Sequence, residues 1–151
     1  MPVLIWGNGA CSDDGTSAAN LLAQVASHGF VAIASGPPGG TPGGGSTTSE
    51  WMAEAIEWVE AGANNGSLNV DSARIMAAGY SCGGTEAYEI VGEGRWEGVK
   101  ALGIFNSGLL GGFELAGGLV TPVMYALGGP EDIAFENVSF CERRQTRRKL
   151  D

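Results

Sequence analysis

A serine flanked by glycines is the side chain of this sequence best placed to do chemistry. Residues 79–83 read Gly-Tyr-Ser-Cys-Gly, follow the apolar run Ile75–Ala78 and precede a segment with helical spacing. A G-x-S-x-G pattern between a strand and a helix is typical of a nucleophile elbow, in which glycines make room for a sharp reversal and the serine takes a strained backbone conformation. We therefore predict that Ser81 is a nucleophile. The alternative is a glycine-rich turn that happens to contain a serine.

A serine nucleophile needs a base to take its proton, a carboxylate to orient that base, and hydrogen-bond donors for the oxyanion. Asp132 follows the last apolar run of the chain. We predict that it is this carboxylate, with Glu131 as the second choice and a solvated turn aspartate as the alternative. The predicted oxyanion donors are the backbone N–H of Cys82 and the loop after the first strand, at Gly9 and Ala10. An ordinary strand-to-helix turn explains that loop equally well.

The base is the member of this set that the sequence does not supply. His28 is the only histidine of the 151 residues. It ends a predicted helix over residues 16–27 that runs back from the carboxyl edge of the sheet, so His28 should lie about 15 Å or more from Ser81. We predict that His28 closes this helix near its last carbonyl groups and does not act as a base.

The three cysteines, Cys11, Cys82 and Cys141, match no zinc-ligand spacing, so we predict no metal site, and no motif calls for a cofactor. Cys11 follows the predicted oxyanion donors, and Cys82 follows the nucleophile. The two should therefore be neighbours at one edge of the sheet. Two interpretations stay open: a disulfide that pins the loop to the elbow, or two small buried thiols.

Strands and helices must alternate to position these residues. The predicted strands cover 3–6, 30–34, 75–78, 99–105 and 122–127, and the predicted helices cover 16–27, 50–62 and 85–91. Near-continuous apolar strands between helices indicate an α/β fold, a three-layer sandwich with a mostly parallel sheet of about five strands and helices on both faces. Functional loops then gather at the carboxyl ends of the strands, which would bring Ser81, Asp132 and residues 9–11 together.

Charge and hydropathy limit the partners. The chain has 17 Asp and Glu against 8 Lys and Arg, a net charge of -9, so we predict that it does not bind nucleic acid. No apolar run approaches the ~18 residues of a membrane span, and the first residues lack the features of a signal peptide. The sequence thus leaves the cellular compartment of the protein undetermined.

Several segments together resemble the α/β-hydrolase superfamily, and within it esterases of the dienelactone hydrolase, chlorophyllase and polyester-hydrolase (cutinase-like) type. The segments are PVLIWGNG at 2–9, ASHGFV at 26–31, GYSCGG at 79–84, NSG at 106–108 and GGPEDIA at 128–134. The resemblance covers about residues 2–137. It implies a secreted or cytosolic serine esterase acting on a small-molecule ester, with Ser81 as nucleophile and Asp132 as acid.

The sequence also departs from that family. Members have further strands before Val3, and a helix, a strand and a histidine-bearing loop after the acid. We therefore interpret residues 1–137 as an incomplete, truncated hydrolase domain and residues 138–151 as a disordered basic tail. The change of composition at the tail is typical of a frameshifted, mis-spliced or partial product, and the alternative is a natural basic tail, solvated and disordered. We expect weak activity or none, and self-association through the uncovered sheet edge.

Two rival functions follow from the same residues. One is a non-catalytic remnant of the hydrolase scaffold that keeps a ligand-binding cleft. The more remote one is a dinucleotide-binding domain, since Gly7-x-Gly9-x-x-Ser12 follows a strand. It lacks the third glycine of that fingerprint and an acid after the second strand.

Overall fold

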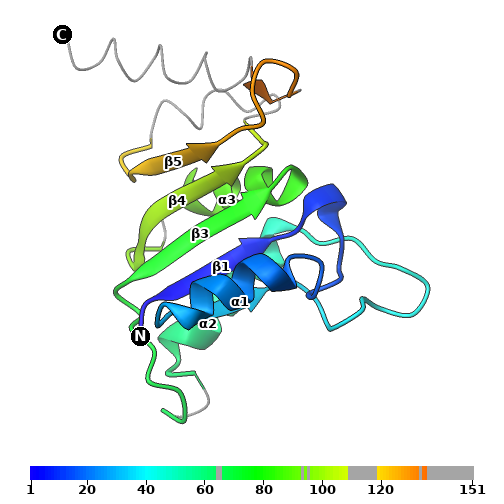
Figure 1. The fold of residues 1–151 in the computed structure, drawn as a ribbon. Helices are drawn as coiled ribbons and strands as arrows, with labels where there is room; N and C mark the ends of the chain where they lie inside the picture. Colours follow the sequence, from blue (N-terminus) through cyan, green and yellow to red (C-terminus); the bar gives the residue numbers. More distant parts are fainter. Residues whose placement is uncertain (64–65, 93, 95, 109–118, 133, 136–151) are drawn as a thin grey trace, which may run out of the picture.

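The computed structural model describes residues 1–63, 66–92, 94, 96–108, 119–132 and 134–135 (Figure 1). The strands of this part of the chain are β1 (Val3–Gly7), β2 (Val31–Ala34), β3 (Ile75–Tyr80), β4 (Val99–Phe105) and β5 (Val123–Ala126). They form one sheet in the order β2-β1-β3-β4-β5, and every neighbouring pair is parallel. The predicted parallel sheet is thus confirmed. The predicted basic tail over residues 138–151 lies outside the described residues.

Helices cover both faces of the sheet, as the alternation of strands and helices predicts. The helical segments are η1 (Gly9–Cys11), α1 (Ala19–Ser27), α2 (Ser49–Glu60) and α3 (Cys82–Gly92). Successive side chains of a strand point to opposite faces, so Val3 and Ile5 pack in a core with α2 and α3, while Leu4 and Trp6 pack in a second core with α1. None of these described helices has the length and apolar character needed to cross a bilayer.

Two helix starts differ from the predicted ones. α1 begins three residues later than predicted because the carboxylate of Asp14 accepts hydrogen bonds from the backbone N–H and hydroxyl of Thr16, which holds this segment in a turn. α3 begins three residues earlier, at Cys82, directly after Ser81. Its N-terminus therefore lies against the predicted nucleophile. Thr48 occupies the N-cap position of α2, but its side chain makes no capping hydrogen bond.

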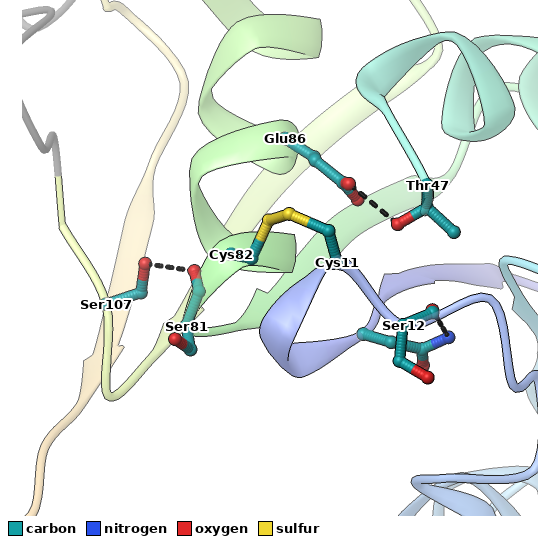
Figure 2. Close-up of a disulfide and its surroundings, with 8 residues drawn as sticks. Cys11, Ser12, Thr47, Ser81, Cys82, Glu86 and Ser107 are labelled. Atoms are coloured by element: carbon teal, nitrogen blue, oxygen red, sulfur yellow. Dashed lines mark hydrogen bonds between the residues drawn. A yellow bond between two sulfur atoms is a disulfide. The ribbon is translucent and has the colours of Figure 1, made fainter. Parts of the chain in front are cut away.

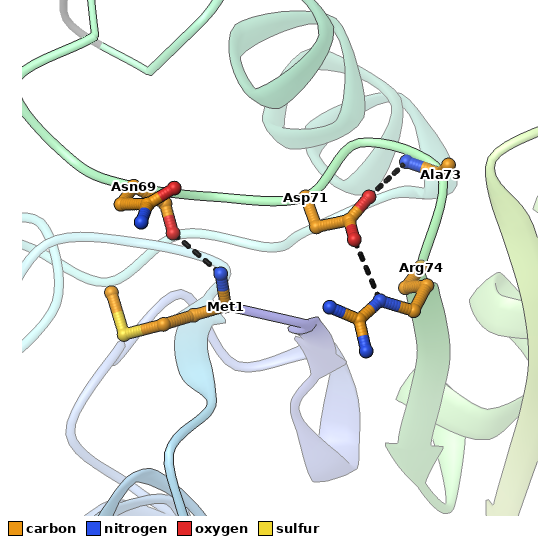
Figure 3. A network of polar contacts seen from close by, with 5 residues as sticks. All are labelled: Met1, Asn69, Asp71, Ala73 and Arg74. Atoms are coloured by element: carbon orange, nitrogen blue, oxygen red, sulfur yellow. Dashed lines mark hydrogen bonds and ion pairs between the residues drawn. The ribbon is translucent and has the colours of Figure 1, made fainter.

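The amino ends of β1 and β3 are tied together at the edge of the sheet opposite Ser81. The amino group of Met1 donates to the Asn69 carbonyl at 2.5 Å, and Val3 N–H donates to the Arg74 carbonyl at 3.0 Å. Asp71 accepts from Arg74 Nε at 2.6 Å and from the Ala73 N–H at 3.0 Å (Figure 3). An exposed ion pair of this kind contributes little to the free energy of folding. The hydrogen bonds of Asp71 instead fix the geometry of the turn that leads into β3.

Candidate functional site

The register of the sheet brings the predicted site segments to one edge. Gly7 of β1 pairs with Gly79 of β3, and Phe105 of β4 pairs with both Tyr80 and, on its other side, Ala126 of β5. The loops that begin after these residues therefore leave the sheet at the same level. They carry η1, Ser81, Asn106 and the 128–132 loop, and we call this level the carboxyl edge.

Ser81 forms the turn between β3 and α3 with a φ of 52°, a left-handed backbone conformation that is rare for residues other than glycine. Its N–H donates to the Phe105 carbonyl at 3.0 Å, and its own carbonyl accepts from the Ser107 hydroxyl at 2.6 Å (Figure 2). These bonds attach the turn at Ser81 to the end of the neighbouring strand β4 and to the residues that follow it. The flanking glycines are required sterically, because a Cβ on Gly79 would lie 2.1 Å from the carbonyl oxygen of Gly83.

Backbone strain is concentrated at this edge. Five non-glycine residues in the described part of the chain have positive φ, and four of them lie here. They are Ala10 (54°), Cys11 (49°), Ser81 (52°) and Asn106 (45°). Such conformations cost of order 1–3 kcal/mol each and persist only where surrounding contacts hold them, which they do most often at functional sites.

A disulfide joins Cys11 at the end of η1 to Cys82 at the start of α3 (Figure 2). The Cα atoms lie 5.2 Å apart across a sequence separation of 71 residues. Of the two interpretations that the sequence left open, the structure thus has the bond and not two separate thiols. The bond connects the two segments from which we predict the oxyanion donors. As the first residue of α3, Cys82 also has a backbone N–H that the helix itself cannot use.

Asn8 holds the loop that contains η1. Its side chain is fully buried, and its amide nitrogen lies 2.8 Å from the Ser35 carbonyl, 2.9 Å from that of Ser12 and 3.1 Å from that of Asp14. Its side-chain oxygen accepts from the Ser17 hydroxyl at 3.0 Å. One amide thus satisfies carbonyl groups from three places in the chain. The sequence marks Asn8 only as part of a Gly-Asn-Gly turn.

Substitution of Asn8 by alanine is expected to destabilise the fold by about 3 kcal/mol, because it leaves buried carbonyl groups without a donor. Urea denaturation followed by circular dichroism measures this change. The matched control is Asn20→Ala, on the exposed side of α1, which should change the free energy of unfolding by less than about 0.5 kcal/mol. Equal stability of the Asn8→Ala variant and the wild type would contradict the positioning role of Asn8.

Asp132 is an ionised acceptor at the carboxyl edge. Its carboxylate accepts from the Ala134 N–H at 2.9 Å, from the Gly128 N–H at 3.0 Å and from the side-chain amide of Asn106. The two backbone donors are the main cause that lowers its pKa below the ordinary aspartate value, and the Asn106 amide adds to them. Asn106 also lines the cavity beside Ser81. Glu131, the second choice, lies exposed next to it.

A cavity of about 600 Å³ opens beside Ser81. Its lining comes from β1, η1, the start of α1 and the ends of β3 and β4: Trp6, Gly9, Ala10, Ser17, Ala18, Leu21, Tyr80, Ser81, Phe105 and Asn106. The rings of Trp6 and Phe105 meet edge to face with centroids 5.3 Å apart. The cavity therefore offers an apolar wall to a ligand and a few polar atoms near the serine, the usual make-up of a small-molecule site.

His28 lies at the other edge of the sheet. It is the C-cap of α1, it is exposed, and its Nε2 lies 3.2 Å from Nε2 of Gln24. The chain enters β2 three residues later at Val31, which pairs with Val3 at the amino end of β1. β3 alone spans six residues, about 20 Å at ~3.3 Å per residue, between that end and Ser81. His28 therefore stays out of reach of the Ser81 hydroxyl.

Glu86 is a buried acid that our reading of the sequence missed. It is 4% exposed, its Oε1 accepts from the Thr47 hydroxyl at 2.8 Å, and its Oε2 has no hydrogen-bond partner (Figure 2). Burial raises the pKa of this carboxyl group above its ordinary value. The available signal was its spacing, since Glu86 stands four residues from both Cys82 and Ile90 on one face of α3.

The same carboxyl group belongs to a cluster of metal-ligand types. Ligand atoms of Cys11, Cys82 and Glu86 all lie within 4.8 Å of one another. The two sulfur atoms are bonded to each other, so neither is a thiolate. In this redox state the cluster offers a cation only a carboxylate.

Comparison with known proteins supports the fold. No protein-family model matches the sequence, and no curated protein sequence is detectably similar. Among solved structures, a candidate carboxylesterase from Lactobacillus plantarum is similar at a TM-score of 0.70 and 15% identity, over 97% of this chain and 70% of its own. A dienelactone hydrolase-like promiscuous phosphotriesterase from metagenomic libraries matches at a TM-score of 0.61 and 19% identity, over 97% of this chain and 66% of its own. A bacterial heroin esterase matches at a TM-score of 0.57 and 24% identity, over 88% of this chain and 49% of its own.

These similarities show that the chain has the α/β-hydrolase fold. At such identities they establish the fold alone. The chain spans between about half and 70% of the length of the structures it matches.

Proposed function

We propose that this chain carries the site of a serine hydrolase for small carboxylic esters, with Ser81 as the nucleophile. The observation that carries the proposal is the left-handed turn at Ser81, which lies between β3 and the first residue of α3 and lines the 600 Å³ cavity. A strained serine at the N-terminus of a helix, beside an apolar cavity, is the arrangement that nucleophilic acyl transfer requires. The esterase names of the structural neighbours agree with it.

Each step of acyl transfer has a candidate group. The Ser81 hydroxyl would attack the ester carbonyl, and the negative charge that develops on the carbonyl oxygen would be received by the backbone N–H of Cys82 and by a second donor at Gly9 or Ala10. Asp132, held ionised by its backbone donors, would orient and stabilise a base. The apolar wall of Trp6 and Phe105 would bind the hydrocarbon part of the ester.

The base is the weak point of this set. The only histidine of the 151 residues lies at the opposite edge of the sheet, so this chain by itself offers no imidazole to Ser81. Without a base the hydroxyl keeps the low nucleophilicity of an alcohol. Oxyanion donors and binding alone leave at most ~10³- to 10⁴-fold acceleration over water, so slow turnover is expected. The same observation favours the second candidate, a scaffold that binds ligands without catalysis.

Hydrolysis of p-nitrophenyl butyrate by the purified chain separates these two functions. We expect slow turnover that falls to the buffer rate in Ser81→Ala and is unchanged in His28→Ala. Ser27→Ala, which removes an exposed hydroxyl at the end of α1, is the matched control and should keep the full rate. Equal rates in wild type and Ser81→Ala would support the non-catalytic scaffold. Loss of turnover in His28→Ala would show that His28 does act as the base.

A further inference from the structure

The Cys11–Cys82 disulfide joins the two segments that form the proposed oxyanion hole. One sulfur belongs to the residue after Ala10, and the other belongs to the residue whose N–H is the main oxyanion donor. The distance between the two donors therefore depends in part on a bond that a thiol can break. Both cysteines are half-buried residues.

Two backbone hydrogen bonds also hold this loop on either side of η1. The Gly83 N–H donates to the Asn8 carbonyl at 3.0 Å, and the Thr47 N–H donates to the Cys11 carbonyl at 2.8 Å. Between these two points the chain passes through Ala10 and Cys11 in left-handed conformations that cost free energy. Once the disulfide is open, the strain at Ala10 and Cys11 favours rearrangement, while the two hydrogen bonds limit how far the loop moves.

Glu86 is a carboxyl group beside the disulfide that can donate a proton. It follows Cys82 by one helical turn, and its carboxylate lies within 4.8 Å of both sulfur atoms. Oε2 has no hydrogen-bond partner, and burial raises the pKa of the carboxyl group, so the group retains its proton further toward neutral pH than an exposed glutamate does. A buried carboxyl group with one oxygen unpartnered next to a disulfide is poorly explained by packing alone.

We propose that Cys11–Cys82 is a site of reversible thiol–disulfide exchange with small dithiols, that Glu86 is its proton donor, and that opening the bond weakens the oxyanion hole. The last part rests on the proposed function.

The exchange balances as a two-electron reduction by the dithiol. A thiolate of the reductant attacks Sγ of Cys11, the S–S bond breaks, and its electron pair goes to Sγ of Cys82. Cys82 is the better leaving group, because its thiolate lies at the N-terminus of α3. That thiolate takes the proton of Glu86. The second thiol of the reductant then displaces Sγ of Cys11 from the mixed disulfide, which leaves a protein dithiol and an oxidised cyclic reductant. The reductant loses two protons in all. One goes to the thiolate of Cys11, and the other restores the proton of Glu86.

The test uses the full chain with Cys141→Ser, which removes the third thiol. Dithiothreitol is added under native conditions, free thiols are counted with Ellman's reagent after its removal, and amide hydrogen exchange is followed over residues 8–12. We expect two thiols to appear and exchange over residues 9–11 to become faster. Glu86→Gln should slow the opening about tenfold, whereas Glu54→Gln, an exposed acid on α2, should leave the opening rate unchanged.

Hydrolysis is measured as the difference between this protein and its Ser81→Ala variant at the same dithiothreitol concentration, since thiols themselves cleave p-nitrophenyl esters. We expect this difference to fall about tenfold on reduction. That is less than the ~10²- to 10³-fold cost of deleting a donor, because the Asn8 and Thr47 bonds remain. A Cys11→Ser/Cys82→Ser variant should show the same low rate without reductant.

Three results would overturn the proposal: no thiols without denaturation, equal opening rates in Glu86→Gln and Glu54→Gln, or an unchanged Ser81-dependent rate once the thiols are free. If the oxidised protein shows no Ser81-dependent rate at all, the proposed function is wrong. The thiol count and the amide exchange then still decide whether the exchange site exists. If the double cysteine variant does not fold, the rates are compared between the oxidised and the chemically reduced forms of the parent chain.

Discussion

An alanine in place of Gly83 is expected to prevent normal folding, or to lower the free energy of unfolding by about 4 kcal/mol or more. A Cβ at this position would lie 2.0 Å from the backbone carbon and oxygen of Gly7 in β1. Both clashes involve main-chain atoms of a buried central strand, which cannot move aside as a flexible side chain can. The same substitution would also break the hydrogen bond from the Gly83 N–H to the Asn8 carbonyl. Effects of this size are exceptional for one methyl group.

The control for Gly83 is Gly29→Ala. Gly29 has a φ of 87°, and a Cβ there would meet nothing within 4 Å. This variant carries only the conformational cost of a left-handed alanine, about 1–2 kcal/mol. Urea denaturation with circular dichroism compares the two proteins. A Gly83→Ala chain as stable as Gly29→Ala would show that α3 and β1 do not approach as closely as the backbone contacts indicate.

Trp6→Ala is expected to cost about 3–5 kcal/mol of stability and to impair binding of apolar esters. Trp6 is 3% exposed, packs edge to face on Phe105 and lines the cavity beside Ser81. Its removal leaves a void that the rigid sheet cannot close, and it takes away the apolar wall of the cavity. Any Ser81-dependent turnover of p-nitrophenyl butyrate should therefore show a raised KM.

Trp58 on α2 gives a control of the same residue type, because it is 36% exposed and lies on the other face of the sheet. Trp58→Ala should cost about 1 kcal/mol or less and leave the KM unchanged. Thermal unfolding and ester kinetics on both variants check the pair. Equal loss of stability in Trp6→Ala and Trp58→Ala would contradict the assignment of Trp6 to the second core.

Local patterns in the sequence were sufficient for the architecture. Apolar runs separated by helical spacing predicted the parallel sheet, and the uninterrupted apolar run at residues 3–6 fits a strand whose side chains pack on both faces of the sheet. Glycines around Ser81 predicted a tight strand-to-helix turn, because only glycine leaves room for the backbone approaches found there. These features depend on neighbours within a few residues, and such neighbours can be read along the chain.

The site depended on contacts between distant segments, which no local pattern specifies. Whether Cys11 and Cys82 form a bond depends on a Cα distance across 71 residues, and the burial of Glu86 depends on Thr47 reaching it from a loop 39 residues earlier. Asn106 meets Asp132 only because β4 and β5 pair in one register. The strands, the helices and the turn at Ser81 could therefore be predicted from the order of residues along the chain. The polar groups that meet beside Ser81 could not, because the packing of the whole sheet brings their side chains together.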